Sequence, residues 1–581
     1  MGRKDNIAGD GRRELQNGIT TLFLIYMGAA YPLIMHDKYF DITVTKYRAF
    51  YIALCIYAVL MVLAVLVDVL GRNVSTGHGS QSLGGNEDAS AGAAHGSRFI
   101  GRLRHFMDMH NIMTMDIFMA GFVLANVLAF FMSGNKVAAY TGEEGRRCGL
   151  QFVLLAFFLY VCMARYCRIR RYVVVIFMLA GSYDFLGLRE GLMQSIRNVY
   201  ISTFGNIDIF ASFLCVLVPV AAGAYISSEG KESIVIRITA VIAVLTGTGA
   251  VIISNANLAY AGVGGAMIVA WIWASYRGRI REFADVCLVM VCGVLAISIM
   301  LGRTDNGYSE LDGLSCFVSD SRMVWIVSVV VLVVWAAIRL ASKWTVKFRG
   351  KAALAVSVGV SLAGIVAVVI YAAHNHMCIF SFEDSWGNYR GFVWRRLMEA
   401  YRDFSVPQKL FGYGNESVKS IMTDRYYDDM MNAVGVIYDN AHNEYLQYLI
   451  TTGIFGAVSY VGLLVTTGGA LVRTAVSGAV MNENESMSSQ SAEKRSKEKA
   501  ASRDSRTVRG SKTGTGLECL LGYAEDEGSM IAVLLGITGY AVQAFVNLNQ
   551  SLTTPYIFLL IAMAGGLCRR YRCRSEIGGR K

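Results

Sequence analysis

The chain has 581 residues, of which 54% are hydrophobic and 17% are charged, and its formal net charge is +11. A soluble domain of this size is less apolar and more charged, so the composition excludes a soluble globular protein. In a chain rich in apolar runs, excess Lys and Arg is typical of cytoplasmic loops rather than of a nucleic-acid binder. The sequence predicts an all-α polytopic membrane protein with no nucleic-acid partner.

Apolar runs long enough to cross ~30 Å of hydrocarbon recur along the chain. The first follows a charged lead without a small-residue cleavage site, so we expect a retained anchor rather than a signal peptide. In all we expect about 14 transmembrane helices, at residues 18–36, 47–70, 112–133, 150–166, 170–184, 207–227, 233–253, 257–276, 283–301, 322–342, 351–373, 444–473, 527–547 and 553–570.

The distribution of Lys and Arg predicts the orientation of these helices, because cytoplasmic loops are enriched in both. The acidic stretch 305–320 lies on the side opposite to the basic stretches, which are 165–171, 277–282, 343–351 and 568–574. Both termini are therefore expected in the cytoplasm. The long segment 374–443 then forms one large extracytoplasmic loop.

The same pattern divides the chain into an N-terminal bundle at 1–373, the outer loop at 374–443 and a helix at 444–473. A linker at 474–526 and a C-terminal helix pair with a basic tail at 527–581 follow. Two stretches rich in Ser, Gly and charge, 75–97 and 482–516, have almost nothing to bury. They are predicted to be disordered cytoplasmic segments.

A metal site and a disulfide framework are both disfavoured. The twelve cysteines form no CxxC pair and lie mostly in apolar runs, where they act as small hydrophobes. His374, His376 and Cys378 form an HxHxC pattern, which is not a standard zinc spacing, and no fourth ligand is evident. We expect no metal and no cofactor.

Several cationic and polar side chains gather on the predicted outer side, where the charge rule disfavours arginine. Arginine binds phosphate oxygens bidentately, and histidine moves protons near neutral pH. Simpler roles exist: two glutamates could pair with the first arginines, and the asparagines could cap helices. Together the residues suit an enzyme acting on a lipid pyrophosphate, and they are Arg146, Arg147, Arg189, Arg197, Asn206, Arg390, His442 and Asn443.

Four stretches together carry a family resemblance: TGEEGRRCGL, STFGNIDIFASFLCVLVP, YRGFVWRRLMEAYRDFSVPQKLFGYG and AHNEYLQYLITTGIFG. They resemble segments of the O-antigen ligase and Wzy-type polymerase superfamily, most strongly at 384–465. The resemblance implies a GT-C-like glycosyltransferase of the bacterial cytoplasmic membrane, with its active site facing outward. It would transfer a glycan from polyprenyl pyrophosphate (undecaprenyl pyrophosphate) to an acceptor hydroxyl, without a metal and with inversion.

The resemblance also implies roles for single residues. His442 matches the family histidine near the acceptor hydroxyl and the anomeric carbon, and Arg390 matches the loop arginine that contacts the pyrophosphate. Arg197 or Arg189 would match a second arginine.

One departure from the family pattern is important. Asn255 follows Ser254 where the family often has arginine. Asn255 can hydrogen-bond a phosphate or a sugar hydroxyl but cannot neutralise charge. Either Arg146 or Arg147 replaces the missing arginine, or the donor differs from the usual one. Asn443 is expected to be a helix cap or a substrate-facing partner of the histidine. Asn206 is a good N-cap and is also a candidate substrate-binding residue.

Three classes of function remain open on the sequence. Within the transferase class, a ligase, a Wzy-type polysaccharide polymerase and a protein O-oligosaccharyltransferase differ in the acceptor. No protein-acceptor module is recognisable, which favours the first two, whose acceptor is a lipid or a glycan. A polysaccharide or lipid transporter would keep its charges near the midplane, whereas the charges here are peripheral. An envelope scaffold would use the predicted cytoplasmic insert at 482–516. Membrane lipids are expected partners in each case.

Overall fold

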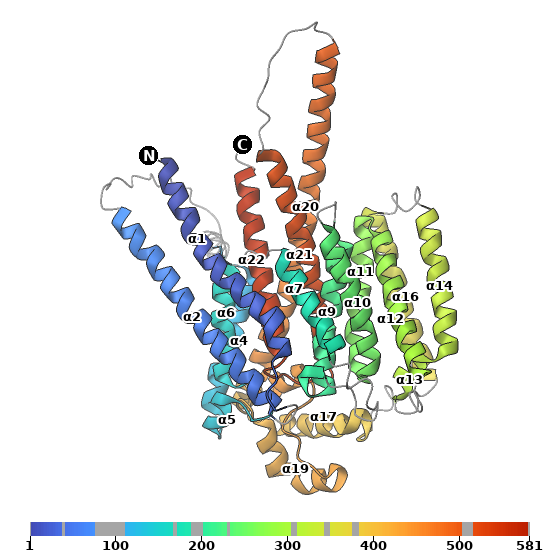
Figure 1. The fold of residues 1–581 in the computed structure, drawn as a ribbon. Helices are drawn as coiled ribbons and strands as arrows, with labels where there is room; N and C mark the ends of the chain where they lie inside the picture. Colours follow the sequence, from blue (N-terminus) through green and yellow to red (C-terminus); the bar gives the residue numbers. More distant parts are fainter. Residues whose placement is uncertain are drawn as a thin grey trace, which may run out of the picture.

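The computed structural model describes residues 2–37, 41–75, 111–166, 171–187, 202–228, 233–303, 311–341, 349–374, 383–501 and 515–578. Within these ranges the regular elements are helices, and no strand occurs. Long helices run side by side, with both chain ends at one end of the bundle and α17 and α19 at the other (Figure 1). The prediction of an all-α chain is therefore confirmed.

The bundle contains a helix at each of the predicted apolar runs. Within the described residues, nine helices are long and apolar enough to cross a membrane, so the number of fourteen spans stays a prediction. The long helices are α1 (Gly2–Ile25), α2 (Ile42–Ser75), α4 (Thr114–Met132), α6 (Leu150–Tyr166), α7 (Arg171–Gly187), α9 (Ile207–Ile226), α10 (Ile234–Ile253), α11 (Asn257–Arg277), α12 (Ile280–Leu301), α14 (Ser321–Leu340), α16 (Gly350–His374), α20 (Glu444–Ala501), α21 (Thr515–Gln543) and α22 (Thr554–Gly578).

Burial separates the centre of the bundle from its rim. The apolar window of α9 is 94% buried, and α9 packs against α10, α11 and α21. A helix that is apolar all round belongs in an interior. The windows of α14 and α16 are only 6% and 11% buried, although both are as apolar as α9. These two helices therefore present their apolar faces to the surroundings, which is the arrangement expected in lipid.

Three short helices form a small subdomain at the end of the bundle away from the chain ends (Figure 1). They are α17 (Trp386–Asp403), α18 (Val406–Phe411) and α19 (Val418–Val434). We call residues 386–434 the cap subdomain. Val393 and Leu397 of α17 and Ile421 of α19 are buried in a core of their own, which also takes Ile450 of α20. The cap subdomain is thus packed onto the start of α20.

Pro407 does not end α17. That helix ends at Asp403, and Pro407 lies in the first turn of α18. Proline is favoured there because its fixed φ suits a helix start and its missing N–H needs no partner.

α20 continues as a helix to Ala501, through residues 482–501, for which the sequence predicts a disordered segment. This stretch is rich in Ala, Glu, Lys and Arg. Such residues extend a helix that the apolar part has already nucleated. Residues 76–110 and 502–514, and with them most of the predicted disordered stretch 75–97, lie outside the described residues.

Candidate functional site

The backbone around His442 is held in an uncommon conformation at the junction of the cap subdomain and α20. His442 has φ 47°, in the left-handed region that few residues other than glycine adopt. Its backbone N–H donates to Asn440 Oδ1 at 2.8 Å. The preceding residue, Ala441, accepts from Trp394 Nε1 at 2.7 Å and donates to Gln447 Oε1 at 2.9 Å. Surrounding side chains therefore fix this strained histidine, which is typical of functional sites.

The residues after His442 anchor the start of α20. Asn443 Oδ1 accepts from the backbone N–H three residues on, at 3.0 Å, so Asn443 is the helix N-cap. The Glu444 backbone N–H donates to the carbonyl of Ala544 at 2.9 Å. The buried carboxylate of Glu444 accepts from the hydroxyls of Tyr460 at 2.7 Å and Tyr540 at 2.6 Å. The chain that follows His442 is thus fixed to the membrane bundle.

The imidazole of His442 is available to a ligand. Its Nδ1 is buried and has no hydrogen-bond partner in the protein, and its ring lies 5.3 Å from the Tyr438 ring between centroids. Burial, reinforced by the charges of Arg390 and Arg146 and opposed by Asp439, lowers the pKa of His442 to about 3. The ring is therefore neutral at physiological pH and can accept a hydrogen bond.

Arg390 lies beside this histidine in an ion pair that joins α17 to α9. Its Nη2 is 2.7 Å from Asp208 Oδ2, and the two side chains are 17% and 22% exposed. Residues 387–389 all have φ near +60° and precede Arg390, so the regular part of the helix begins at Arg390. The Tyr438 hydroxyl donates to the carbonyl of Asn388 at 3.0 Å and fixes this turn.

Arg146 is fully buried and already has carboxylate partners. Its Nη2 donates to Glu416 of the cap subdomain, and to the carbonyl of Asp439 at 2.9 Å. Its Nε lies 3.9 Å from Asp439 Oδ2, while Nε and Nη1 form no hydrogen bond. Burial raises the pKa of Glu416, and the charge of Arg146 acts in the opposite direction. Arg146 therefore clamps its loop to the cap subdomain and to the His442 loop.

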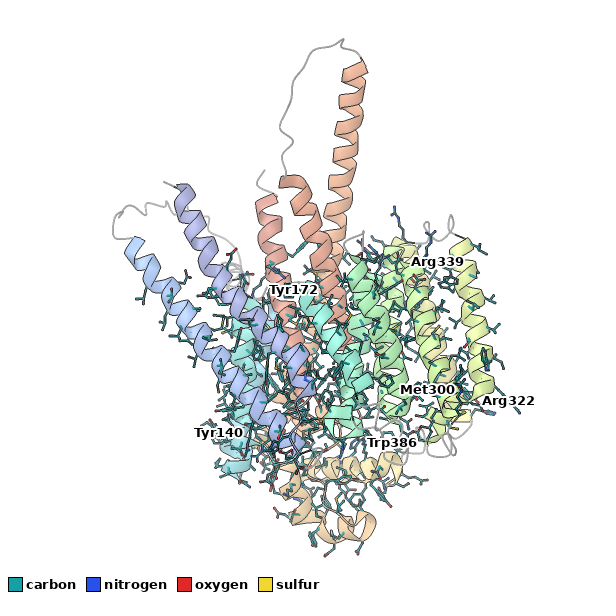
Figure 2. All side chains as sticks on the ribbon, in the orientation of Figure 1. Tyr140, Tyr172, Met300, Arg322, Arg339 and Trp386 are labelled. Carbon is teal, nitrogen blue, oxygen red and sulfur yellow. The ribbon has the colours of Figure 1, made fainter. Side chains whose placement is uncertain are left out.

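The loop around Arg146 lies at the same end of the bundle as α17, since Tyr140 and Trp386 are both found there (Figure 2). Only one of the two glutamates in this loop forms an ion pair with an arginine of the same loop. Glu143 pairs with Lys419 at 3.3 Å, and Glu144 lies 3.9 Å from Arg147. The pairing of Glu143 and Glu144 with both neighbouring arginines, considered from the sequence, thus holds only for Arg147.

The remaining predicted residues lie in different surroundings. Asn206 Oδ1 accepts from the backbone N–H of Asp208 at 2.8 Å, so Asn206 caps α9 and places Asp208 for its pair with Arg390. Asn255 Oδ1 accepts from the backbone N–H of Asp312 at 2.7 Å and ties the turn between α10 and α11 to a later loop. Arg189 and Arg197 lie outside the described residues.

Sequence reasoning missed a buried polar stretch between α21 and α22, residues 543–554, which we call the polar segment. It contacts the backbone of each part of the site. Its Ala544 accepts from Glu444, its Ser551 N–H donates to the Arg146 carbonyl at 2.9 Å, and its Asn547 Nδ2 donates to the Asp208 carbonyl at 2.9 Å. Its buried polar residues are Gln543, Asn547, Asn549, Gln550, Ser551, Thr553 and Thr554.

A sequence signal for the polar segment existed but belonged to no motif. The run NLNQSLTT interrupts two apolar runs, and a run of amides and hydroxyls at a membrane boundary is ordinarily a solvated turn. Parts of the chain at least a hundred residues earlier cover it: Tyr448 near the start of α20 contacts Asn549, and Trp394 of the cap subdomain packs on Phe545.

A comparison with known families bears on this region. Residues 308–461 match the family model described as O-antigen ligase. We call this segment the O-antigen ligase domain, after the family model that it matches. It contains the cap subdomain, Arg390, His442 and the start of α20, and it confirms the resemblance found in the sequence. A search of curated proteins found no match.

The O-antigen ligase domain does not act alone in the structure. Arg146, Asp208 and the polar segment lie outside residues 308–461 but contact its key residues directly. Among the described residues, no group of three or more His, Cys, Asp or Glu side chains is arranged to hold a metal ion. His376 and Cys378 of the HxHxC pattern are not among the described residues.

Proposed function

We propose that this protein is a membrane glycosyltransferase of the O-antigen ligase type. It would transfer a glycan from a polyprenyl pyrophosphate to an acceptor hydroxyl. The observation that carries the proposal is a neutral, conformationally strained His442 with a free Nδ1, close to the cation of Arg390, within the O-antigen ligase domain.

Two arginines would hold the pyrophosphate. A guanidinium has five N–H donors, so Arg390 can keep Asp208 on one edge and bind a phosphate oxygen on another. Arg146 has unpaired Nε and Nη1 groups, which makes it the candidate to replace the arginine missing at Asn255. By the resemblance, Arg197 or Arg189 would add a further cation. Arg147 is less suited because its ion-pair partner, Glu144, is 93% exposed.

The chemistry then follows from charge. Departure of polyprenyl pyrophosphate develops negative charge, and preorganised guanidinium groups stabilise charge that develops in the transition state. His442 Nδ1 would accept the proton of the attacking hydroxyl or orient it. In the free protein burial, and after it the charges of the arginines, lower the pKa of His442. An anionic donor opposes the field of the arginines and so raises this pKa. Attack opposite the leaving group inverts the anomeric centre.

An apolar pocket between η1 (Tyr26–Ala30), α7, α9, α21 and α22 suits the polyprenyl tail. Met27, Phe177 and Val216 are among its lining residues. Tyr556, which also lines it, lies two residues after the end of the polar segment. A lipid tail in this pocket would bring its head group toward the site.

The proposed sidedness combines charge with architecture. Arg339 lies at the end of α14 nearer the chain termini, and Arg322 at the end nearer the cap subdomain (Figure 2). The basic stretch 568–574 lies in the C-terminal part of α22. The positive-inside rule therefore favours a cytoplasmic side for the termini and an outer side for the cap subdomain. The protein would thus act at the outer face of a bacterial cytoplasmic membrane. A Wzy-type polymerase would use the same chemistry with a glycan as acceptor.

Arg390→Lys tests bidentate binding of phosphate. Lysine retains the charge but loses the planar fork that holds Asp208 and phosphate together. We expect kcat/KM for the lipid-linked donor to fall roughly tenfold to a hundredfold, measured by glycan transfer with protein reconstituted in lipid vesicles. The exposed Arg395→Lys is the matched control and should leave the rate unchanged. Equal activity of wild type and Arg390→Lys would count against a bidentate contact.

The pH dependence tests the state of His442. Because its pKa in the free protein is about 3, kcat/KM, which reports groups of the free enzyme, should vary less than about twofold between pH 5 and pH 7.5. An ordinary histidine would instead lose activity below about pH 6.5. An acid limb near pH 6.5 that disappears in His442→Gln would contradict the proposed electrostatics.

A further inference from the structure

The polar segment contains several polar atoms that are buried but make no hydrogen bond within the protein. Burying such an atom without a partner costs about 1–3 kcal/mol, so native proteins rarely keep several together. The five residues that carry these atoms are each at most 4% exposed. The atoms are Gln543 Nε2, Asn549 Oδ1, Gln550 Nε2, Ser551 Oγ and Thr553 Oγ1.

Other polar atoms of the same segment do make structural contacts, and they account for its conformation. Asn547 Nδ2 lies within hydrogen-bond distance of Ser212 Oγ at 2.6 Å and Gln543 Oε1 at 2.9 Å. The Tyr31 hydroxyl donates to the Ser551 carbonyl at 2.7 Å. The paired atoms therefore hold the segment to α9 and to the N-terminal helices, and the five unpaired atoms add nothing to this attachment.

The unpaired atoms lie beside the candidate site. The segment contacts Glu444, which adjoins His442, as well as Arg146 and Asp208, the partner of Arg390. The other buried atoms without a partner at this end include His442 Nδ1 and the Nε and Nη1 atoms of Arg146. One cluster of unpaired groups thus combines a histidine, a guanidinium and a set of neutral amides and hydroxyls.

The chemistry of these atoms points to a sugar rather than to a phosphate. Residues 543–568 contain no Asp, Glu, Lys or Arg, so the segment offers no charge to neutralise an anion. It offers two amide donors, one amide acceptor and two hydroxyls that both donate and accept. Such a mixture matches the hydroxyls of a sugar ring, whereas phosphate is better bound by cations.

We infer that the polar segment forms the subsite for the donor's first sugar, between the polyprenyl tail pocket and His442. This inference rests on the proposed function. It assigns the pyrophosphate to the arginines and the sugar to Gln543, Asn549, Gln550, Ser551 and Thr553. The specificity of the protein for its glycan would then be set largely by a stretch outside the O-antigen ligase domain.

The test compares Gln550→Met and Ser551→Ala with a matched control, Gln16→Met. Gln16 is 1% exposed, and its amide atoms also form no hydrogen bond. It lies in α1, however, roughly 20 Å by helical rise from Tyr31, the residue of the N-terminal region that contacts the polar segment. The full-length protein is reconstituted in lipid. The donor is the lipid-linked glycan isolated from a strain that lacks this protein, and the competitor is undecaprenyl pyrophosphate without a sugar.

For the two variants in the segment we expect the KM for the donor to rise about tenfold, as expected for the loss of one hydrogen bond to a sugar. The inhibition constant of undecaprenyl pyrophosphate should stay within about twofold, because the lost group contacts no phosphate. The midpoint of thermal unfolding should be unchanged or higher, since an unpaired buried group has been removed. Gln16→Met should change none of the kinetic constants.

Three results would overturn the inference. An unchanged KM in both variants would show that the segment does not contact the sugar. A rise in the inhibition constant equal to the rise in KM would assign the segment to the pyrophosphate. A lower unfolding midpoint in both variants would show that these atoms are structural. If wild-type protein transfers no glycan, the proposed function itself fails, which is distinct from these three results.

Discussion

Replacing His442 with alanine is expected to reduce glycan transfer by roughly 10²–10⁴-fold, the usual contribution of a positioned proton acceptor. The reason is geometric as well as electrostatic. The His442 backbone is held in a left-handed conformation by its neighbours, and its Nδ1 has no partner within the protein. Removing the ring should therefore take away the acceptor for the hydroxyl proton without removing any hydrogen bond that holds the fold.

The measurement is transfer of glycan by purified protein, with the unfolding midpoint recorded in parallel. His36→Ala is a matched control, because the His36 side chain is 77% exposed and pairs with Asp41, far in the sequence from the residues assigned to the reaction. We expect the control to transfer glycan at the wild-type rate. If His442→Ala kept most of the activity, the role given to this histidine would be wrong, whatever the fate of the arginines.

Replacing Arg146 with alanine is expected to destabilise the protein by about 3–5 kcal/mol, the usual cost of removing one partner of a buried ion pair. The substitution leaves Glu416 buried against Asp439 with no cation. Burial already raises the pKa of Glu416, and Arg146 holds it down. Without Arg146 this pKa rises further, so the loss of stability should shrink as the pH is lowered and Glu416 takes up a proton.

The double variant Arg146→Met with Glu416→Gln separates the structural role of Arg146 from a role in binding. It removes both charges, and replacing a buried pair by neutral groups is often tolerated. We expect thermal stability to return to near the wild-type value while transfer stays low, because the pyrophosphate would still lack this cation. Recovery of both stability and transfer would make Arg146 purely structural, and an undiminished stability of Arg146→Ala would refute the clamp.

The sequence predicted those parts of the structure that depend on local pattern. Apolar runs located the long helices, and the asparagines at 206 and 443 were recognised as caps because capping is decided within a few residues. Arg390 and His442 were proposed from the family resemblance, and the structure places both at the junction of the cap subdomain and the bundle.

Features that depend on distant parts of the chain could not be predicted. Arg146 and Glu416 are separated by 270 positions, and Arg390 and Asp208 by 182. No local pattern pairs such residues. The sequence therefore offered only the neighbouring glutamates as partners of Arg146, whereas the structure pairs it with Glu416 of the cap subdomain. The polar segment was missed for the same reason, since amides and hydroxyls reveal their function only when the fold buries them.

One measurement tests the central claim most directly. The purified full-length protein is reconstituted in lipid vesicles with the lipid-linked glycan and an acceptor extract, in the absence of any nucleotide sugar. Our account predicts release of polyprenyl pyrophosphate together with attachment of the glycan to the acceptor, both lost in His442→Ala. Folded wild-type protein that releases no polyprenyl pyrophosphate, or that moves the intact lipid-linked glycan across the membrane without cleaving it, would contradict the account.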